Sequence, residues 1–310
     1  MSLDPQAQNL LDKVEQAGIP PYETMEPVVA RQYYEKACDL ARGNPPQLFE
    51  VKNISIPGPR SELPAIYYRA RQADSLPILV YFHGGGYTIG SPTSHDSVCR
   101  HLCLEADCIV ISVDYRLAPE HPFPAAIDDA FAATQWVSEQ ARALGGDPER
   151  IGVGGDSAGG NLSASVCLQA KLETGPKLAF QLLIYPGTDM TQSFSSHETF
   201  GQGYLLTSSL IAWFYQNYMP NEPDNTQWRT SPLHANDHSE LPPAFVLTAG
   251  FDPLQDEGKA YAEKLKAAGV PVSYSHYEGM LHGFITQPGF IDKAREAISE
   301  CASHLKNAFK

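Results

Sequence analysis

The sequence has few basic residues for its size. Its 310 residues include 22 Lys and Arg against 36 Asp and Glu, which gives a formal net charge of −14. Proteins that bind nucleic acids concentrate Lys and Arg to displace the counterions of the phosphate backbone. The composition therefore argues against a nucleic-acid partner, and we interpret the negative charge as a contribution to solubility.

The sequence also lacks a long apolar run near its N-terminus. Residues 1–18, MSLDPQAQNLLDKVEQAG, carry acidic side chains throughout. A secretory signal needs an apolar stretch of about 7–15 residues, and a membrane-spanning helix needs about 20. We therefore predict no membrane partner and a cytoplasmic location.

Cysteine is scarce, and most of the six cysteines lie in apolar stretches. Without an export signal, such residues are expected to remain free thiols. Cys99 and Cys103 flank His101, a pattern that is compatible with a metal site. Cysteines four residues apart on an apolar helix face are more often packing residues, however. We predict buried free thiols and no bound metal.

An alternation of strand and helix patterns begins at about residue 48. Short β-branched runs are followed by segments with apolar residues at three-to-four spacing, at roughly 94–107, 124–144, 158–174, 254–268 and 290–308. This order predicts an α/β fold with about eight mostly parallel strands flanked by helices. The expected strands are FEVKNISIP, LPAIYYRA, LPILVYFH, CIVISVDY, RIGVGG, AFQLLIYP, PPAFVLTAG and VPVSYSHYE.

Two segments fall outside this alternation, residues 1–45 and residues 188–228. The second is rich in aromatic side chains, as in GYLLTSSLIAWFYQNYM. We expect the two segments to pack together as a small helical cap. The catalytic core would then comprise residues 46–187 and 229–310, in line with α/β folds of this length that form one core.

The strongest chemical signal is GGDSAGG at 154–160, between the strand pattern RIGVGG and the helical pattern NLSASVCLQAKLE. It contains G-x-S-x-G, in which a serine projects from a sharp turn between a strand and a helix. Glycines keep the neighbouring positions small, and the helix N-terminus places a positive dipole end beside developing negative charge. We predict that Ser157 is a nucleophile.

A second glycine-rich motif, HGGG at 83–86, follows the strand pattern LPILVYF. Acyl transfer creates an oxyanion that needs preorganised N–H donors, and a glycine run lets the backbone approach it closely. We predict that Gly85, Gly86 and the N–H of Ala158 form an oxyanion hole.

An orienting acid and a base should follow the serine in that order. Asp252 comes shortly after the strand AFVLTAG, and His282 lies between the last strand and the last helix. The carboxyl ends of parallel strands meet at one edge of the sheet, so three strand-end loops would contribute one residue each. Asp189, after the strand QLLIYP, also satisfies the order. We prefer Asp252 because Asp189 lies where the cap insertion begins.

The other nine histidines are expected to have surface or structural roles. His276 falls in a strand pattern, His304 falls in a helical pattern, and His83 belongs to the glycine loop. The remaining ones precede the candidate acid, at positions 95, 101, 121, 197, 234 and 238.

Taken together, these motifs resemble the bacterial hormone-sensitive-lipase-like esterases, in the branch with a GDSAG nucleophile motif. The matching motifs are HGGG at 83–86, DYRLAPEHPFPAA at 114–126, GDSAGG at 155–160, DPLQDEG at 252–258 and HGF at 282–284. The likeness is close over residues 48–310 and looser before them.

The resemblance implies an α/β-hydrolase core with an N-terminal cap, no cofactor, and carboxylesterase activity toward small acyl esters. It assigns Ser157, Asp252 and His282 to a catalytic triad and Gly85, Gly86 and Ala158 to the oxyanion hole. It implies that His83 is structural and that Asp114, Arg116 and Glu120 form an ion-pair network supporting the glycine loop. The implied partner is a small-molecule ester, and a homodimer stays open because dimers occur in the family.

Two other functions stay open from the sequence. An amidase or deacetylase would use the same triad, and the motifs do not separate it from an esterase. A non-catalytic ligand-binding protein is the second, since a fold does not fix a function. The complete Ser–Asp–His set argues against that second reading.

The aromatic side chains of residues 188–228 predict an apolar pocket. Part of them must pack the cap onto the core, since aromatic residues chiefly contribute burial. We expect the rest, with side chains next to the motifs, to line a closed pocket over Ser157. The predicted substrate-binding residues are Tyr87, Tyr204, Leu206, Phe214 and Phe284.

Overall fold

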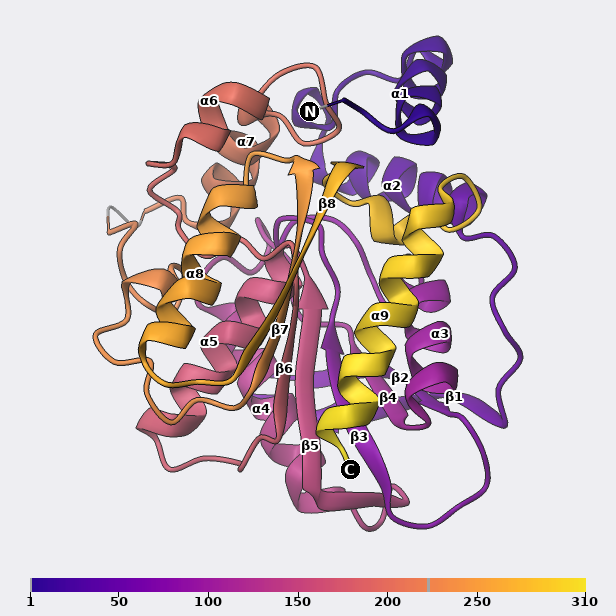
Figure 1. Ribbon diagram of the computed structural model, residues 1–310, viewed down its shortest axis with the longest axis vertical. Helices are drawn as coiled ribbons and strands as arrows, with labels where there is room; N and C mark the ends of the chain where they lie inside the picture. The colour runs from indigo at the N-terminus through magenta and orange to yellow at the C-terminus, as the bar shows by residue number, and fades with distance from the viewer. Residues whose placement is uncertain (1, 222–223) are drawn as a thin grey trace.

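A computed structural model describes residues 2–221 and 224–310 of the chain (Figure 1). Residue 1 and residues 222–223, which fall within the predicted cap segments 1–45 and 188–228, lie outside the described residues.

Within the described residues, the centre of the fold is an eight-stranded sheet with the order β1-β2-β4-β3-β5-β6-β7-β8. Strand β2 runs antiparallel to its neighbours β1 and β4, and the pairings from β4 to β8 are parallel. The strands are β1 (Glu50–Pro57), β2 (Glu62–Arg69), β3 (Leu76–Phe82), β4 (Ile109–Val113), β5 (Gly146–Asp156), β6 (Phe180–Ile184), β7 (Ala244–Phe251) and β8 (Val272–Leu281). The predicted mostly parallel sheet is confirmed.

Helices connect and cover these strands. The α-helices are α1 (Pro5–Ala17), α2 (Pro27–Ala41), α3 (Asp96–Ala106), α4 (Ala125–Gln140), α5 (Ala158–Leu172), α6 (Ser195–Phe200), α7 (Ser208–Tyr218), α8 (Gln255–Ala267) and α9 (Asp292–Ala308). Short 3₁₀ helices lie at η1 (Tyr22–Thr24), η2 (Pro232–His234) and η3 (Phe284–Thr286).

Strand β3 illustrates why this sequence forms a sheet covered on both faces. Every residue of β3 is buried, as expected for a parallel strand in the middle of an α/β fold. Because successive side chains point to opposite faces, Val80 and Phe82 join one hydrophobic cluster while Leu79 and Tyr81 join another. The apolar run LPILVYF therefore supplies both cores of the molecule.

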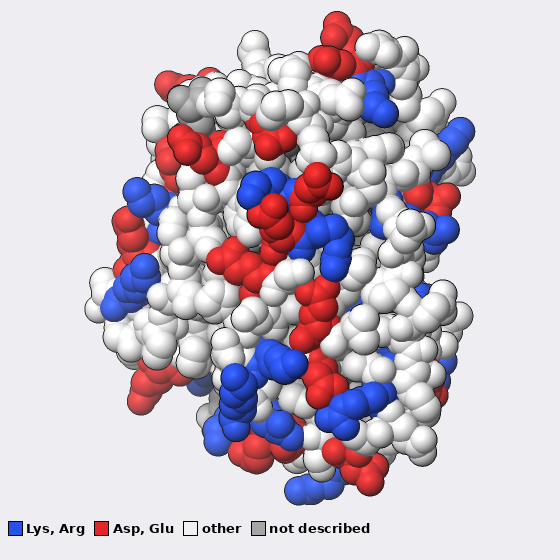
Figure 2. Space-filling model, turned by 45° about the vertical axis from the view of Figure 1, so that its right-hand side comes forward, with Lys and Arg blue, Asp and Glu red and all other residues white. Residues whose placement is uncertain are grey.

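Each cluster is completed by a different set of helices (Figure 1). Helices α4, α5 and α8 contribute to the cluster on one face, and helices α3 and α9 contribute to the cluster on the other. Figure 2 shows acidic and basic side chains mixed over one side of the molecule. An ion pair between Arg295 and Glu105 joins α9 to α3.

The segments 1–45 and 188–228 contribute helices that lie beyond the carboxyl ends of the strands, where α1, α2, α6 and α7 are drawn in Figure 1. A third apolar cluster joins Ala30 of α2 to residues around α7 and to Ile89 and Leu254 of the loops below. Its other buried members are Leu206, Leu210, Ile211 and Phe214. The two segments thus pack against each other and onto the end of the sheet.

The six cysteines are free and buried, as predicted. Burial raises the pKa of Cys38 and of Cys103 to about 12, so both remain thiols at neutral pH. Among the described residues, no helix is both long enough and apolar enough to span a membrane.

Candidate active site

Ser157, His282 and Asp252 form one hydrogen-bonded line at the carboxyl ends of the strands. His282 Nε2 lies 2.9 Å from Ser157 Oγ, and His282 Nδ1 lies 2.7 Å from Asp252 Oδ2. Asp252 has no exposed surface and His282 is buried, while Ser157 remains partly accessible. Of the three side chains, Ser157 is thus the one most accessible to a substrate.

The acceptor at the end of this line fixes the positions of the protons. A carboxylate can only accept, so His282 Nδ1 donates to Asp252 and Nε2 is left to accept the proton of the Ser157 hydroxyl. The backbone N–H of Leu254 donates to the other Asp252 oxygen at 2.8 Å. With both oxygens engaged, the carboxylate holds the imidazole in the tautomer that a general base requires.

Sheet register brings the acid and the histidine together. Phe251 of β7 pairs with Leu281 of β8, so the residues that follow, Asp252 and His282, leave the two strands side by side. The register shifts between Ala249 and Phe251, where the facing stretch of β8 from Tyr277 to Leu281 is longer, as in a β-bulge or a similar irregularity. Bulges near sites redirect side chains at the end of a strand.

A sharp turn between β5 and α5 presents Ser157. Its φ of 56° and ψ of −118° lie in a region that costs a non-glycine residue on the order of 1–3 kcal/mol. The turn packs closely on β3, since a Cβ at Gly159 would lie 1.8 Å from the carbonyl oxygen of Phe82. Only glycine fits there, which explains the small residues of the motif.

The glycine loop after β3 lies beside this turn. Gly85 and Gly86 have φ values of 118° and 56°, which side chains rarely adopt. Ala158 is the first residue of α5, so its N–H has no partner within the helix. The backbone is thus shaped to offer free N–H groups near the serine, although the donor roles of these residues stay predictions.

Contacts from Tyr115 and from Arg31 hold the glycine loop. The Tyr115 hydroxyl donates to the carbonyl of His83 at 2.7 Å, and Arg31 of α2 donates to the carbonyl of Thr88 at 2.8 Å. Arg31 also pairs with Glu120, which links the PEHP segment to the loop. Arg116 pairs with Asp129 instead.

Asp189, the alternative acid, is engaged elsewhere. It lies 2.9 Å from His234 Nε2 and accepts from the backbone N–H of Thr191 and from the Ser193 hydroxyl. The carboxylate in contact with His282 is that of Asp252.

The residues predicted to bind substrate have different surroundings. Leu206 and Phe214 belong to the cluster around α7, and the Phe214 ring lies against Gly86 of the glycine loop. Tyr87 stacks on Tyr218 with ring centroids 3.8 Å apart.

Tyr204 and Phe284 lie against other aromatic rings. Tyr204 packs against Phe251 at the end of β7, with ring centroids 5.2 Å apart. Phe284 has no exposed surface and packs against Tyr185 and Tyr277, which favours a core role for it. Substrate contact by all five residues stays a prediction.

Two features of the site were not predicted from the sequence. Tyr185 follows β6 with a φ of 33°, and its ring centroid lies 4.6 Å from that of His282. Asp156, the variable residue of the G-x-S-x-G pattern, is buried and bonded to His95. The apolar run before Tyr185 indicates only a strand end, and the sequence predicts no more than a surface or structural role for His95.

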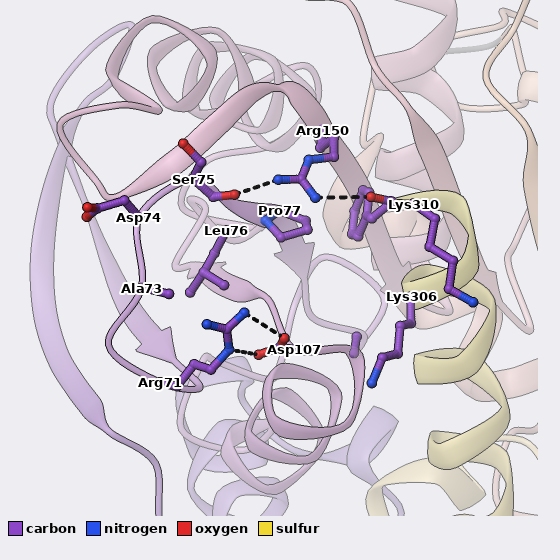
Figure 3. Close-up of a pocket in the computed structure, with 12 residues that line it drawn as sticks. Arg71, Ala73, Asp74, Ser75, Leu76, Pro77, Asp107, Arg150, Lys306 and Lys310 are labelled. Carbon is purple, nitrogen blue, oxygen red and sulfur yellow. Dashed lines mark hydrogen bonds and ion pairs between the residues drawn. The ribbon is translucent and has the colours of Figure 1, made fainter.

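A separate cavity of about 400 Å³ lies at the opposite end of the sheet, where β3 begins (Figure 3). Its lining includes Leu76 of β3 and Lys306 of α9. Arg71 is bonded to Asp107, and Arg150 to the Ser75 carbonyl and to Asp147. The cavity lies at the amino end of β3, whereas Ser157 follows the carboxyl end of the neighbouring parallel strand β5. Within residues 2–221 and 224–310, no group of three His, Cys, Asp or Glu side chains is arranged to hold a metal ion.

Comparison with known proteins agrees with this geometry. A family model described as alpha/beta hydrolase fold matches residues 79–286, a range that contains the serine, the acid and the histidine. The chain belongs to this α/β-hydrolase family.

This chain is similar to known ester hydrolases over nearly its whole length. It is 42% identical to the carboxylic ester hydrolase LipN of Mycobacterium tuberculosis, with 98% of this chain and 84% of the relative covered. It is 38% identical to an ethyl acetate hydrolase of Pseudomonas putida, with 96% of each covered. A solved ester hydrolase from the metagenome of Lake Arreo is 44% identical, covers 99% of both chains and superimposes with a TM-score of 0.97.

Replacing the acid tests the hydrogen-bonded line. Asp252→Asn should lower kcat by about 10⁴-fold, because an amide at this position favours the wrong tautomer of His282. Asp189→Asn is the matched control and should leave kcat nearly unchanged, since that carboxylate bonds His234. Steady-state kinetics with p-nitrophenyl acetate, beside thermal unfolding of each variant, would measure both effects. The reverse ranking would show that Asp189 serves as the acid.

Proposed function

We propose that this esterase is a serine carboxylesterase that hydrolyses short- to medium-chain acyl esters through Ser157, His282 and Asp252. The observation that carries the proposal is the line of contacts at 2.9 Å and 2.7 Å that joins the three side chains. The likeness to an ethyl acetate hydrolase supports a small ester as the substrate class.

Acylation follows from the protonation pattern of this line. His282 Nε2 removes the proton of Ser157 as Oγ attacks the ester carbonyl, and the imidazolium that forms is stabilised by Asp252. The carbonyl oxygen takes up negative charge, which the N–H groups of Gly85, Gly86 and Ala158 stabilise. His282 then returns its proton to the leaving alkoxide, which departs as the alcohol and leaves an acyl group on Ser157.

Deacylation repeats the same steps with water. His282 takes a proton from the water as its oxygen attacks the acyl carbonyl, and a second oxyanion forms in the same place. Collapse of this intermediate breaks the bond to Ser157 Oγ, which regains its proton from His282. The carboxylic acid leaves, and the resting arrangement of the three side chains is restored.

The cap, which we assign to residues 1–45 and 188–228, supplies the specificity in this proposal. Phe214 and Leu206 lie in the cluster that closes over the glycine loop, and Phe214 contacts Gly86 directly. An acyl chain bound at Ser157 would meet this apolar surface. A homodimer and a cytoplasmic location stay predictions.

Removal of the nucleophile tests the reaction and its substrate class together. Ser157→Ala should lower kcat for p-nitrophenyl acetate by about 10⁴-fold or more while the protein stays folded, because no covalent route remains. The unsubstituted protein should also turn over this ester far faster than the matched anilide, p-nitroacetanilide. Preference for the anilide would indicate an amidase. Absence of turnover with either compound in folded protein would indicate a ligand-binding protein.

Acyl-chain length tests the closed pocket. Each buried methylene contributes about 0.8 kcal/mol, or roughly fourfold in kcat/KM, until the pocket is full. Across p-nitrophenyl esters, kcat/KM should therefore rise from acetate to a maximum near butyrate or hexanoate and fall steeply by laurate. An optimum at palmitate with activation at an oil–water interface would characterise a true lipase and contradict the closed pocket.

A further inference from the structure

A second histidine–carboxylate pair lies behind the glycine loop. His95, immediately before α3, has no exposed surface, and Asp156 is only 3% exposed. His95 Nε2 lies 3.2 Å from Asp156 Oδ2, although the two residues are 61 positions apart in the sequence. Asp156 directly precedes Ser157, so this pair adjoins the nucleophile.

The neighbours of His95 determine its protonation state. The Ser94 hydroxyl lies 2.9 Å from His95 Nδ1 and donates its one proton to the carbonyl of Ser91 at 2.8 Å. Ser94 Oγ can therefore only accept from Nδ1, which must carry a hydrogen. Nε2 faces a carboxylate, which also only accepts. An acceptor on each ring nitrogen is the pattern expected for an imidazolium.

The Asp156 carboxylate also accepts hydrogen bonds from β3 and from the glycine loop. Its Oδ1 accepts from the Tyr81 hydroxyl at 2.8 Å and from the backbone N–H of Gly84 at 3.0 Å. Gly84 N lies farther from His95 Nε2, at 3.4 Å, so the carboxylate is its acceptor. The loop lies so close to the carboxylate that a Cβ at Gly84 would be 2.3 Å from Asp156 Oδ2.

The charges around the pair agree with this assignment. Burial by itself lowers the pKa of His95, but the charge and hydrogen bond of Asp156 outweigh it, so the pKa of His95 lies above its usual value. Glu35 of α2, which accepts from the Ser91 hydroxyl, adds negative charge nearby. Burial and the charge of His95 lower the pKa of the neighbouring His83 to about 3, so His83 is neutral.

We propose that His95 is a positioning residue of this esterase, a buried imidazolium that neutralises Asp156 and thereby fixes the glycine loop beside Ser157. The inference rests on the proposed hydrolysis at Ser157. His95 does not touch the reacting atoms. It acts through the carboxylate that holds Gly84, next to the predicted oxyanion donors Gly85 and Gly86.

Charge balance explains why the carboxylate needs this partner. The reaction develops negative charge in the oxyanion hole, and charges interact strongly in a site that excludes water. An unpaired Asp156 carboxylate would oppose that charge. If the unpaired carboxylate took up a proton instead, the neutral carboxyl group would be a weaker acceptor for the N–H of Gly84. With His95 protonated, Asp156 can be a strong acceptor while the pair stays neutral.

Paired substitutions test this role. His95→Asn should lower kcat by about 10- to 100-fold with KM changed less than threefold, below the loss expected for removal of a whole oxyanion donor. The second change, Asp156→Asn, should then raise kcat of the first variant about tenfold. An amide keeps an acceptor for Tyr81 and Gly84 and places a neutral N–H₂ toward residue 95.

The control is His238→Asn, which removes another buried imidazole, one that bonds the carbonyl of Pro232 and not a carboxylate. Its kcat should stay within twofold of the unsubstituted protein. If His95→Asn does not fold, the double variant alone decides, because it should fold and retain measurable turnover. A His95→Asn variant as active as the control, or a folded double variant no more active than the single one, would overturn the proposal.

Assays of the unsubstituted protein distinguish failure of the positioning role from failure of the proposed function. If it does not hydrolyse p-nitrophenyl acetate, the proposed function fails. If it does but His95→Asn is as active, only the positioning role fails. In ¹⁵N spectra of histidine-labelled protein at pH 8, the signals of an imidazolium should be present that disappear in His95→Asn and persist in His238→Asn. A neutral His95 ring at this pH would also overturn the proposal.

Discussion

The close approach of the β5–α5 turn to strand β3 is the constraint on which the rest of the site depends. Phe82 ends β3 and immediately precedes the HGGG loop, and its carbonyl leaves no room for a side chain at Gly159. The contact brings the serine turn and the glycine loop together. It also brings Asp156 under Gly84, so one carboxylate joins the two segments.

At the same end of the sheet, strand register positions the acid and the histidine. The pairing of Phe251 with Leu281 places the acid and the histidine side by side, and the order of the strands places them near the serine. Strand β7 is buried along its whole length and β8 is buried at its end, so a slip in register would expose core side chains to water. The distances between the three catalytic side chains therefore depend on the pairing of strands that are stabilised by the hydrophobic core.

The strands, helices and motif positions were predictable because each depends on local sequence. The LPILVYF run, the GDSAG turn and the HGGG loop can each be recognised from a few consecutive residues. The choice between Asp252 and Asp189 is less local. Both follow strands in the correct order, and only the β7–β8 pairing shows which carboxylate contacts His282.

Side-chain direction and long-range partners were not predictable in this way. Phe284 lies two residues from His282 in sequence, and the sequence does not show that its side chain is fully buried between Tyr185 and Tyr277. His95 resembles any histidine before a helix. Its significance depends on Asp156, Ser94 and the glycine loop converging around it, and a single sequence does not reveal that convergence.

A crystal structure of the protein treated with a reactive alkyl phosphonate would test the central claim most directly. The account predicts a covalent bond between phosphorus and Ser157 Oγ, with one phosphoryl oxygen about 2.7–3.1 Å from the backbone nitrogens of Gly85, Gly86 and Ala158. Attachment to another residue, or a phosphoryl oxygen pointing away from these nitrogens, would contradict it.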